Sequence, residues 1–220
     1  MNTILAQFDF QGMLTKNSGE FLSALAGALF GAAMAFWFDN LSEKTRRKRD
    51  EHGAIVRSQL ALIGQLSTIR NIQKQLLDKF RNVPNRELQL IEFSMTDTSI
   101  RVTYDSISFL LMTKNPELVL EVHSAEQSYL SAMECLKSRN EAYLELHRKS
   151  KLEEINMLTG QCKISINDPR MVKKLKDLTD HLYAAMDTAQ ERLSLQIIEL
   201  FKAGKAIYPK KNFLEIKGEK

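Results

Sequence analysis

The side chains best suited to chemistry lie close together near the middle of the chain, at Arg139, Asn140 and His147. An arginine can stabilise a phosphate group, and a histidine can transfer a proton near neutral pH. Asn140 and His147 fall on the otherwise apolar face of an expected helix, where a polar side chain needs a hydrogen-bond partner or water. These residues are therefore the candidate catalytic set. The alternative is a polar contact that sets the register between helices, or a helix face that ends in solvent.

Other catalytic and metal-binding patterns are missing from the sequence. It contains no Walker-type phosphate loop and no GxGxxG, HExxH or GxSxG motif. The 4 histidines are scattered along the chain. Neither Cys135 nor Cys162 belongs to a CxxC pair, so we predict reduced thiols, no metal site and no cofactor.

Long helices are expected to position the candidate residues. With only 9 Gly and 4 Pro in 220 residues, the chain is poor in helix breakers. Asn115 and Asp168 each precede a proline, which is typical of a helix start. Apolar spacing predicts helices over 39–80, 97–112, 116–158 and 167–204. Four amphipathic helices with short connections predict an all-α, antiparallel bundle.

The N-terminal region predicts a membrane span. Residues 21–38 carry no charged side chain and end in an aromatic group at Phe36, Trp37 and Phe38. Such a segment is long enough for one transmembrane helix, with aromatic rings at the headgroup level. A cleaved signal peptide, with Ala33 and Ala35 as the small residues, and a buried core helix are the alternatives.

Basic residues predict the orientation of that span. They follow it directly in the sequence, at Lys44, Arg46, Arg47, Lys48 and Arg49. Positive residues favour the cytoplasmic side and also touch anionic lipid. We therefore expect a bacterial inner-membrane protein with residues 1–19 outside, a span at 20–39, a long juxtamembrane helix at 40–84, a cytoplasmic bundle at 85–205 and a basic tail at 206–220.

Small residues recur every four positions within the predicted span. Ser23, Gly27, Gly31 and Ala35 form one stripe, and stripes of this kind allow close packing of helices in lipid. One span has no partner helix in its own chain, so the stripe predicts homo-oligomerisation. The alternative is that small residues are simply common in membrane helices.

The helical bundle with Arg139, Asn140 and His147 resembles HEPN domains, which cut RNA with paired arginine and histidine residues across a dimer. Seven residues lie between Arg139 and His147, which is one more than the longest spacing in that motif. The layout is also similar to small membrane-anchored accessory proteins found beside RNA-targeting CRISPR effectors. This resemblance implies a pore that depolarises the membrane in anti-phage defence, with an RNA-guided nuclease as a partner.

Three functions follow from these features. The first is a membrane effector that assembles through the small-residue stripe. The second is a membrane-tethered RNase or RNA-binding module that uses Arg139 and His147. The third is a passive scaffold that holds a partner protein at the bilayer. The mild net charge of +4 does not by itself indicate nucleic-acid binding.

Overall fold

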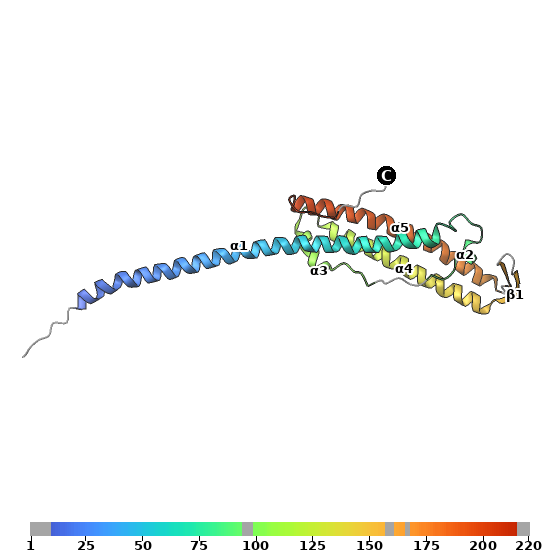
Figure 1. The fold of residues 1–220 in the computed structure, drawn as a ribbon, viewed down its shortest axis with the longest axis horizontal. Coiled ribbons are helices and arrows are strands. Elements are labelled where there is room, and N and C mark those ends of the chain that lie inside the picture. Colours follow the sequence, from blue (N-terminus) through green and yellow to red (C-terminus); the bar gives the residue numbers. More distant parts are fainter. Residues whose placement is uncertain (1–9, 94–98, 157–160, 166–167, 215–220) are drawn as a thin grey trace, which may run out of the picture. The chain divides into compact units, whose positions relative to one another are not determined.

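The computed structural model describes the backbone of residues 10–93, 99–156, 161–165 and 168–214. Side chains are described for residues 23, 25–93, 99–150 and 168–214. The chain divides into two compact units, Met1–Asp50 and Glu51–Lys220. Figure 1 shows that long helices dominate both units, so the predicted all-α class is confirmed at the level of the main architecture.

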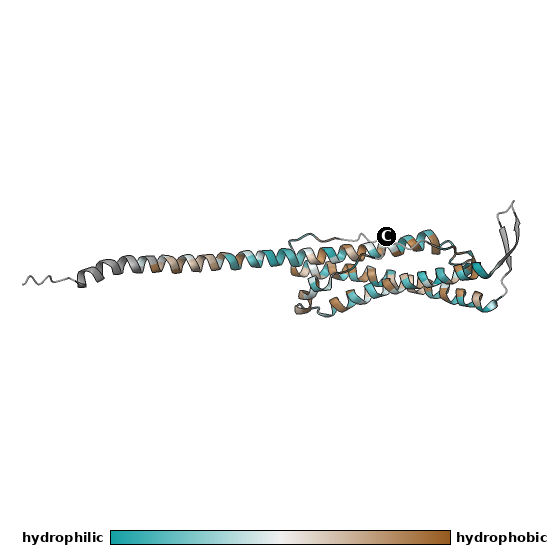
Figure 2. Cartoon of the chain, turned by 90° about the horizontal axis from the view of Figure 1, so that it is seen from below, coloured by the Kyte–Doolittle hydropathy of each residue, from teal (hydrophilic) through white to brown (hydrophobic). Residues whose placement is uncertain are grey.

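The first unit contains the N-terminal part of α1, an uninterrupted helix over Phe10–Ile72. Its described side chains are exposed almost throughout, including Leu29, Phe30, Phe36, Trp37 and Phe38. Brown, hydrophobic residues precede a teal, hydrophilic stretch along this part of the helix in Figure 2. The unit buries no core of its own within its described residues.

Within the described residues, no helix is both long and apolar enough to cross a membrane. The predicted span includes Phe21, Leu22 and Ala24, whose side chains lie outside the described residues. The predicted N-terminal segment 1–19 has no described side chain either. The membrane topology therefore stays a prediction.

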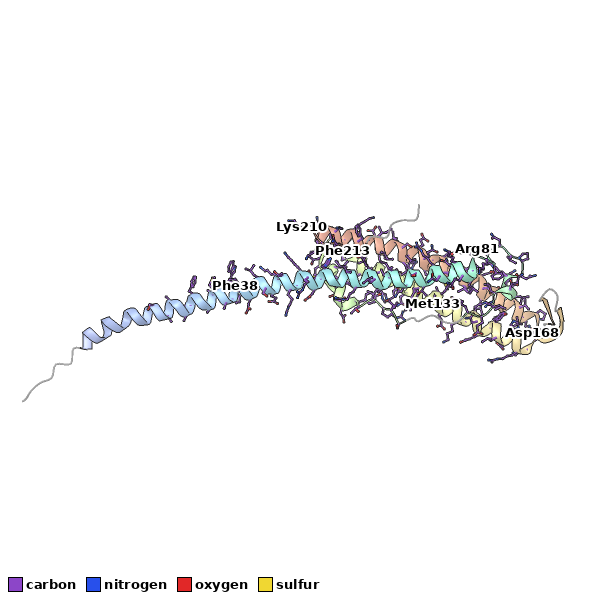
Figure 3. The ribbon with its side chains drawn as sticks, in the orientation of Figure 1. Phe38, Arg81, Met133, Asp168, Lys210 and Phe213 are labelled. Atoms are coloured by element: carbon purple, nitrogen blue, oxygen red, sulfur yellow. The ribbon has the colours of Figure 1, made fainter. Side chains whose placement is uncertain are left out.

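The second unit is built on three long helices. These are the C-terminal part of α1, α4 over Glu117–Lys149 and α5 over Pro169–Ile207. Their apolar faces meet in one core, in which Leu62, Ile69, Leu136, Met186 and Leu193 are almost completely buried. Met133, labelled in Figure 3, lies in the same core. Burial of this apolar surface is the main stabilising contribution to the unit.

The helices of the core do not all alternate in direction. Glu51 of α1 contacts Tyr208, directly after α5, and Gln73, directly after α1, contacts Asp187 in the middle of α5. α1 and α5 are therefore antiparallel. α4 and α5 are also antiparallel, because Leu146 and Leu175 pack together on either side of their connection. α1 and α4 therefore run parallel, which corrects the prediction of a fully antiparallel bundle.

The reason for the parallel pair is the segment between α1 and α4, which returns along the bundle without a long helix. α1 ends in one π-helical turn, η1 over Gln73–Leu77, and is followed by α2 over Arg86–Gln89. The return then has α3 over Tyr104–Ile107 and a 3-10 helix, η2, over Ser108–Met112. Figure 1 shows α2 and α3 at well-separated places along α4.

The helix predicted over 97–112 is confirmed in part: residues 104–112 are helical, as α3 and η2, whereas residues 99–103 are not. Residues 99–103 have no regular secondary structure, and residues 94–98 lie outside the described residues. The Ile100 carbonyl accepts a hydrogen bond from Gln65, and the Val102 backbone N–H donates to Glu126. These tertiary partners take up backbone groups that a helix would pair internally.

The predicted start of α5 is confirmed, because the Asp168 carboxylate accepts a hydrogen bond from the Arg170 backbone N–H at 2.9 Å. α4 starts where predicted but has no side-chain cap. It also ends at Lys149 rather than at residue 158, because the chain turns into an antiparallel hairpin of β1, Lys151–Asn156, and β2, Gln161–Ser165. Helical spacing alone missed this hairpin.

Candidate functional site

Arg139, the first candidate catalytic residue, is buried with only 1% of its surface exposed. Its guanidinium donates to the backbone carbonyls of Glu87 at 3.0 Å, Ile91 at 3.1 Å and Leu90. Glu87 lies within α2, and Leu90 and Ile91 directly follow its last residue. A cation suits that position because the last carbonyls of a helix have no partner within the helix. We call Arg139 and its carbonyl partners the Arg139 cluster.

No carboxylate pairs with Arg139 in the described part of the chain. Burial lowers the pKa of Arg139 to about 10, since a charged guanidinium loses hydration in the core. The ring of Tyr143 partly compensates, with its centroid 4.7 Å from the guanidinium carbon. The Nε atom of Arg139 has no hydrogen-bond partner among the described residues.

Asn140, the second candidate, supports the same segment. Its side-chain amide donates to the Phe93 carbonyl at 2.9 Å. Arg139 and Asn140 thus hold the chain that leaves α2 against α4, and both lie on the protein interior rather than on an open surface. Both side chains therefore make structural contacts with the segment that follows α2.

His147, the third candidate, is exposed and lies two helical turns from Arg139. Tyr143 lies between them, with its ring 4.7 Å from the Arg139 guanidinium carbon and 4.3 Å from the His147 ring. Arg139 and His147 therefore do not meet within one chain. The structure brings Arg139 and Asn140 together and leaves His147 apart from them.

A second polar cluster, which the sequence analysis missed, surrounds Glu126. This carboxylate is buried with 3% of its residue surface exposed. It accepts hydrogen bonds from Gln65, from the Val102 backbone and from the Tyr104 hydroxyl. Burial, and then the hydrogen bond to Glu126, raise the pKa of Tyr104. The signal in the sequence was a glutamate four residues after Val122, on the apolar face of α4.

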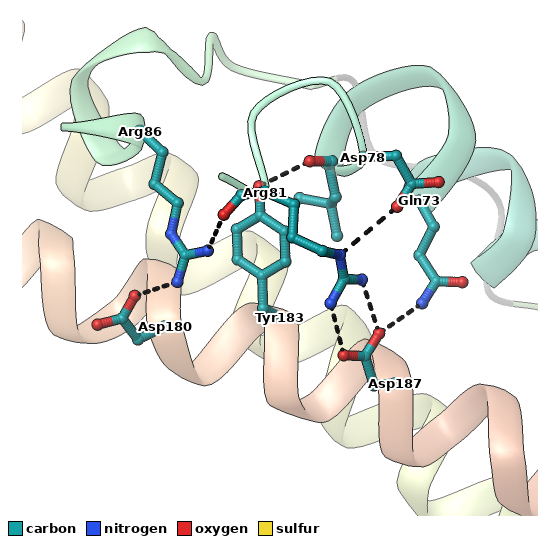
Figure 4. Close-up of polar contacts among 8 residues, drawn as sticks. Gln73, Asp78, Arg81, Arg86, Asp180, Tyr183 and Asp187 are labelled. Atoms are coloured by element: carbon teal, nitrogen blue, oxygen red, sulfur yellow. Dashed lines mark hydrogen bonds and ion pairs between the residues drawn. The ribbon is translucent and has the colours of Figure 1, made fainter. Parts of the chain in front are cut away.

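A third cluster, also missed by the sequence analysis, centres on Tyr183 of α5 (Figure 4). The guanidinium carbons of Arg81 and Arg86 lie 5.1 Å and 4.2 Å from the centroid of its ring. Arg81 makes two hydrogen bonds to Asp187, at 2.8 Å and 2.9 Å, and Arg86 contacts Asp180 at 2.6 Å. We call these five residues the Tyr183 cluster.

The Tyr183 cluster fixes the turn after α1. The Tyr183 hydroxyl donates to the Leu77 carbonyl at 2.8 Å, and Gln73 donates to Asp187 at 3.0 Å. The hydrogen bond from Arg81 holds the pKa of Asp187 below its usual range. Both arginines already have carboxylate partners, so the cluster orders the chain and offers no free cation to a ligand.

The described residues contain no group of three or more His, Cys, Asp or Glu side chains arranged to hold a metal ion. Of the two cysteines, Cys135 is a free thiol whose pKa is raised by burial, and Cys162 lies outside the residues with described side chains. In the three clusters, the described polar groups contact one another and the backbone of neighbouring segments. Their chemistry is that of positioning and stabilising the bundle.

Comparison of the chain with protein-family models, with curated proteins and with solved structures found no match.

Proposed function

We propose that this protein is a membrane effector that attaches to the bilayer and assembles with copies of itself through its N-terminal helix. The observation that carries the proposal is the set of large apolar side chains exposed in the first unit. Phe30, Phe36 and Phe38 expose 70%, 72% and 58% of their surface, and Leu29 exposes 64%. A continuous apolar surface of this kind marks a membrane or protein contact.

The charge pattern supports one orientation in the bilayer. The basic residues Lys44, Arg46, Arg47, Lys48 and Arg49 follow the apolar segment, and residues of the same helix before it carry fewer positive charges. Because positive residues are retained on the cytoplasmic side, we place the second unit in the cytoplasm and residues 1–19 outside.

Self-association is proposed because the small-residue stripe has open space around it. A Cβ atom added to Gly27 or Gly31 would meet no other atom within 4 Å. Ser23 and Ala35 extend the same stripe and are exposed. Close packing of a second copy against this stripe would use space that the single chain leaves empty. Perturbation of the membrane, as in anti-phage defence, is the proposed result of this assembly.

The experiment is to express the chain in bacteria and to follow membrane potential with a potential-sensitive dye. We expect the wild type to depolarise the membrane and the double variant Gly27→Leu/Gly31→Leu to lose that effect, since leucine blocks close approach. The matched control is Ala26→Leu/Ala33→Leu, which adds bulk off the stripe and should retain the effect. Equal depolarisation by both double variants would contradict assembly through the stripe.

The RNase alternative receives less support from the geometry. Arg139 is used for backbone carbonyls, and His147 is separated from it by Tyr143. An RNA phosphate would need an accessible guanidinium, whereas Arg139 is 1% exposed. The geometry therefore favours the membrane effector over the RNase.

A further inference from the structure

One end of the second unit combines exposed apolar side chains with lysines. Met112 is 92% exposed and Leu111 is 47% exposed, at the turn that leads into α4. Met112, Lys114, Lys202 and Ala206 line one open cleft of about 680 Å³ between this turn and the last turns of α5. Figure 3 places Lys210 and Phe213 at this end of the bundle and Asp168 at the other. We call this region the basal surface.

The basal surface carries several exposed lysines. Lys114, Lys210 and Lys211 are exposed and make no ion pair within the described part of the chain. Lys202 pairs with Glu199 at 2.8 Å. Lysines beside an apolar side chain are typical of proteins that rest on a lipid interface, where the chain carbons stay in apolar contact and the ammonium stays in water.

Residues 208–214, which follow α5, pack against this end, so Lys210 and Lys211 have a defined position. The Phe213 ring packs against Gly204, where an added Cβ would lie only 2.6 Å from a ring atom. His52 lies edge-on to Phe213, with the ring centroids 4.8 Å apart, and its Nε2 atom is 2.8 Å from the Asn212 carbonyl. Residues 208–214 thus present Lys210 and Lys211 as part of a folded surface.

The basal surface lies at the end of the second unit where the chain enters it. Glu51, the first residue of the unit, accepts a hydrogen bond from the Tyr208 hydroxyl, close to Lys210. Asp50, which precedes Glu51, ends the unit that contains the apolar segment and the basic residues 44–49. In the sequence, residues 39–50 lie between the apolar segment 21–38 and the start of the second unit.

We propose that the basal surface binds an anionic lipid bilayer, with its lysines at the headgroup phosphates and Met112 and Leu111 in the interface. The proposal deepens the proposed function and rests on it only for bringing the membrane near. Each lysine that acts in this way strengthens the contact about fivefold. The second unit would then be held against the membrane by its own folded surface as well as by the chain before it.

The test uses the full chain, purified in mild detergent and reconstituted into vesicles. A Met112→Cys variant, in a Cys135→Ser/Cys162→Ser background, carries an environment-sensitive dye. Nitroxide lipids report its contact with the interface. The matched control is Leu88→Cys, another partly exposed apolar position, on α2 at the other end of the core.

We expect quenching of the Met112→Cys dye in vesicles that contain phosphatidylglycerol, and much weaker quenching in phosphatidylcholine alone. Lys114→Gln/Lys210→Gln/Lys211→Gln should reduce the quenching in anionic vesicles, and the Leu88→Cys dye should stay in water throughout. A Met112→Cys dye that remains in water in both lipids overturns the proposal and leaves the surface to a protein partner.

Flotation of the same vesicles after a carbonate wash measures attachment of the chain separately. Chain that floats without quenching at Met112→Cys contradicts the basal contact and leaves the N-terminal attachment standing. Protein that the carbonate wash removes from the vesicles, but whose Met112→Cys dye is quenched when anionic vesicles are added, contradicts the N-terminal attachment. The same result supports the basal contact.

Discussion

Two arginine-containing clusters hold the same stretch of chain after α1, and they do so by opposite means. In the Arg139 cluster, a buried guanidinium donates to backbone carbonyls and has no acidic partner. In the Tyr183 cluster, two partly exposed guanidiniums pair with carboxylates and flank an aromatic ring. The first fixes the chain that leaves α2 against α4, and the second fixes the turn before α2 against α5.

The difference shows how burial sets the value of a polar contact. An exposed ion pair competes with water and gains little. A buried guanidinium has lost its water, so each hydrogen bond to a carbonyl contributes more to the free energy of unfolding. Removing the guanidinium would also leave those carbonyls buried without a donor. The two clusters should therefore respond very differently to substitution.

The largest effect is expected for Arg139→Ala. The carbonyls of Glu87, Leu90 and Ile91 would lose their donor inside the protein, and the side chain would leave a cavity. At about 1 kcal/mol or more for each unsatisfied carbonyl, we expect a loss of about 3 kcal/mol in the free energy of unfolding. Urea unfolding of the purified full chain, followed by circular dichroism, measures it.

His147→Ala is the control for that measurement. His147 is exposed on the same helix, so its removal should change the free energy of unfolding by less than about 0.5 kcal/mol. Equal losses for both variants would contradict the contrast between a buried and an exposed position. RNase activity in the wild type that only these two variants abolish, without loss of stability, would revive the catalytic interpretation.

An intermediate effect is expected for Tyr183→Phe. The variant keeps the ring between Arg81 and Arg86 but loses the hydroxyl that donates to the Leu77 carbonyl at 2.8 Å. We expect a loss of about 1 kcal/mol, measured as a lower urea midpoint. Tyr143→Phe is the matched control, because its hydroxyl has no protein partner among the described residues; a larger loss in that control would contradict our assignment of the hydrogen bond.

The smallest effect is expected for Asp187→Asn, and it should depend on pH. Because Arg81 lowers the folded-state pKa of Asp187, the pair stabilises the fold above the unfolded pKa of about 3.9. That contribution is lost as the pH falls through the lower folded pKa. For this half-exposed pair we expect about 0.5 kcal/mol at pH 7.

Urea midpoints of the wild type and Asp187→Asn, measured from pH 7 down to strongly acidic conditions, test this dependence. The two proteins should converge in acid. A difference that stays constant across the whole range would show that Asp187 acts through packing rather than through its charge.

Much of the helical framework could be read from the sequence. The apolar spacing of α4 and α5 predicts helices because residues three and four apart share one face. Asp168 before Pro169 predicts the start of α5, since a short polar side chain can cap the first turn and proline needs no donor there. The return segment was harder, because its backbone groups pair with Gln65 and Glu126, which are distant in sequence.

By itself, the sequence determined that the chain is mainly helical and where α4 and α5 begin. It also determined that apolar and basic residues are segregated near the N-terminus. Only the tertiary structure decided that α1 and α4 run parallel, that Arg139 donates to backbone carbonyls and that Met112 lines the same cleft as Lys202. Local patterns record the preferences of neighbouring residues. The partners of a buried charge or an exposed surface come from distant segments, which only the folded chain brings together.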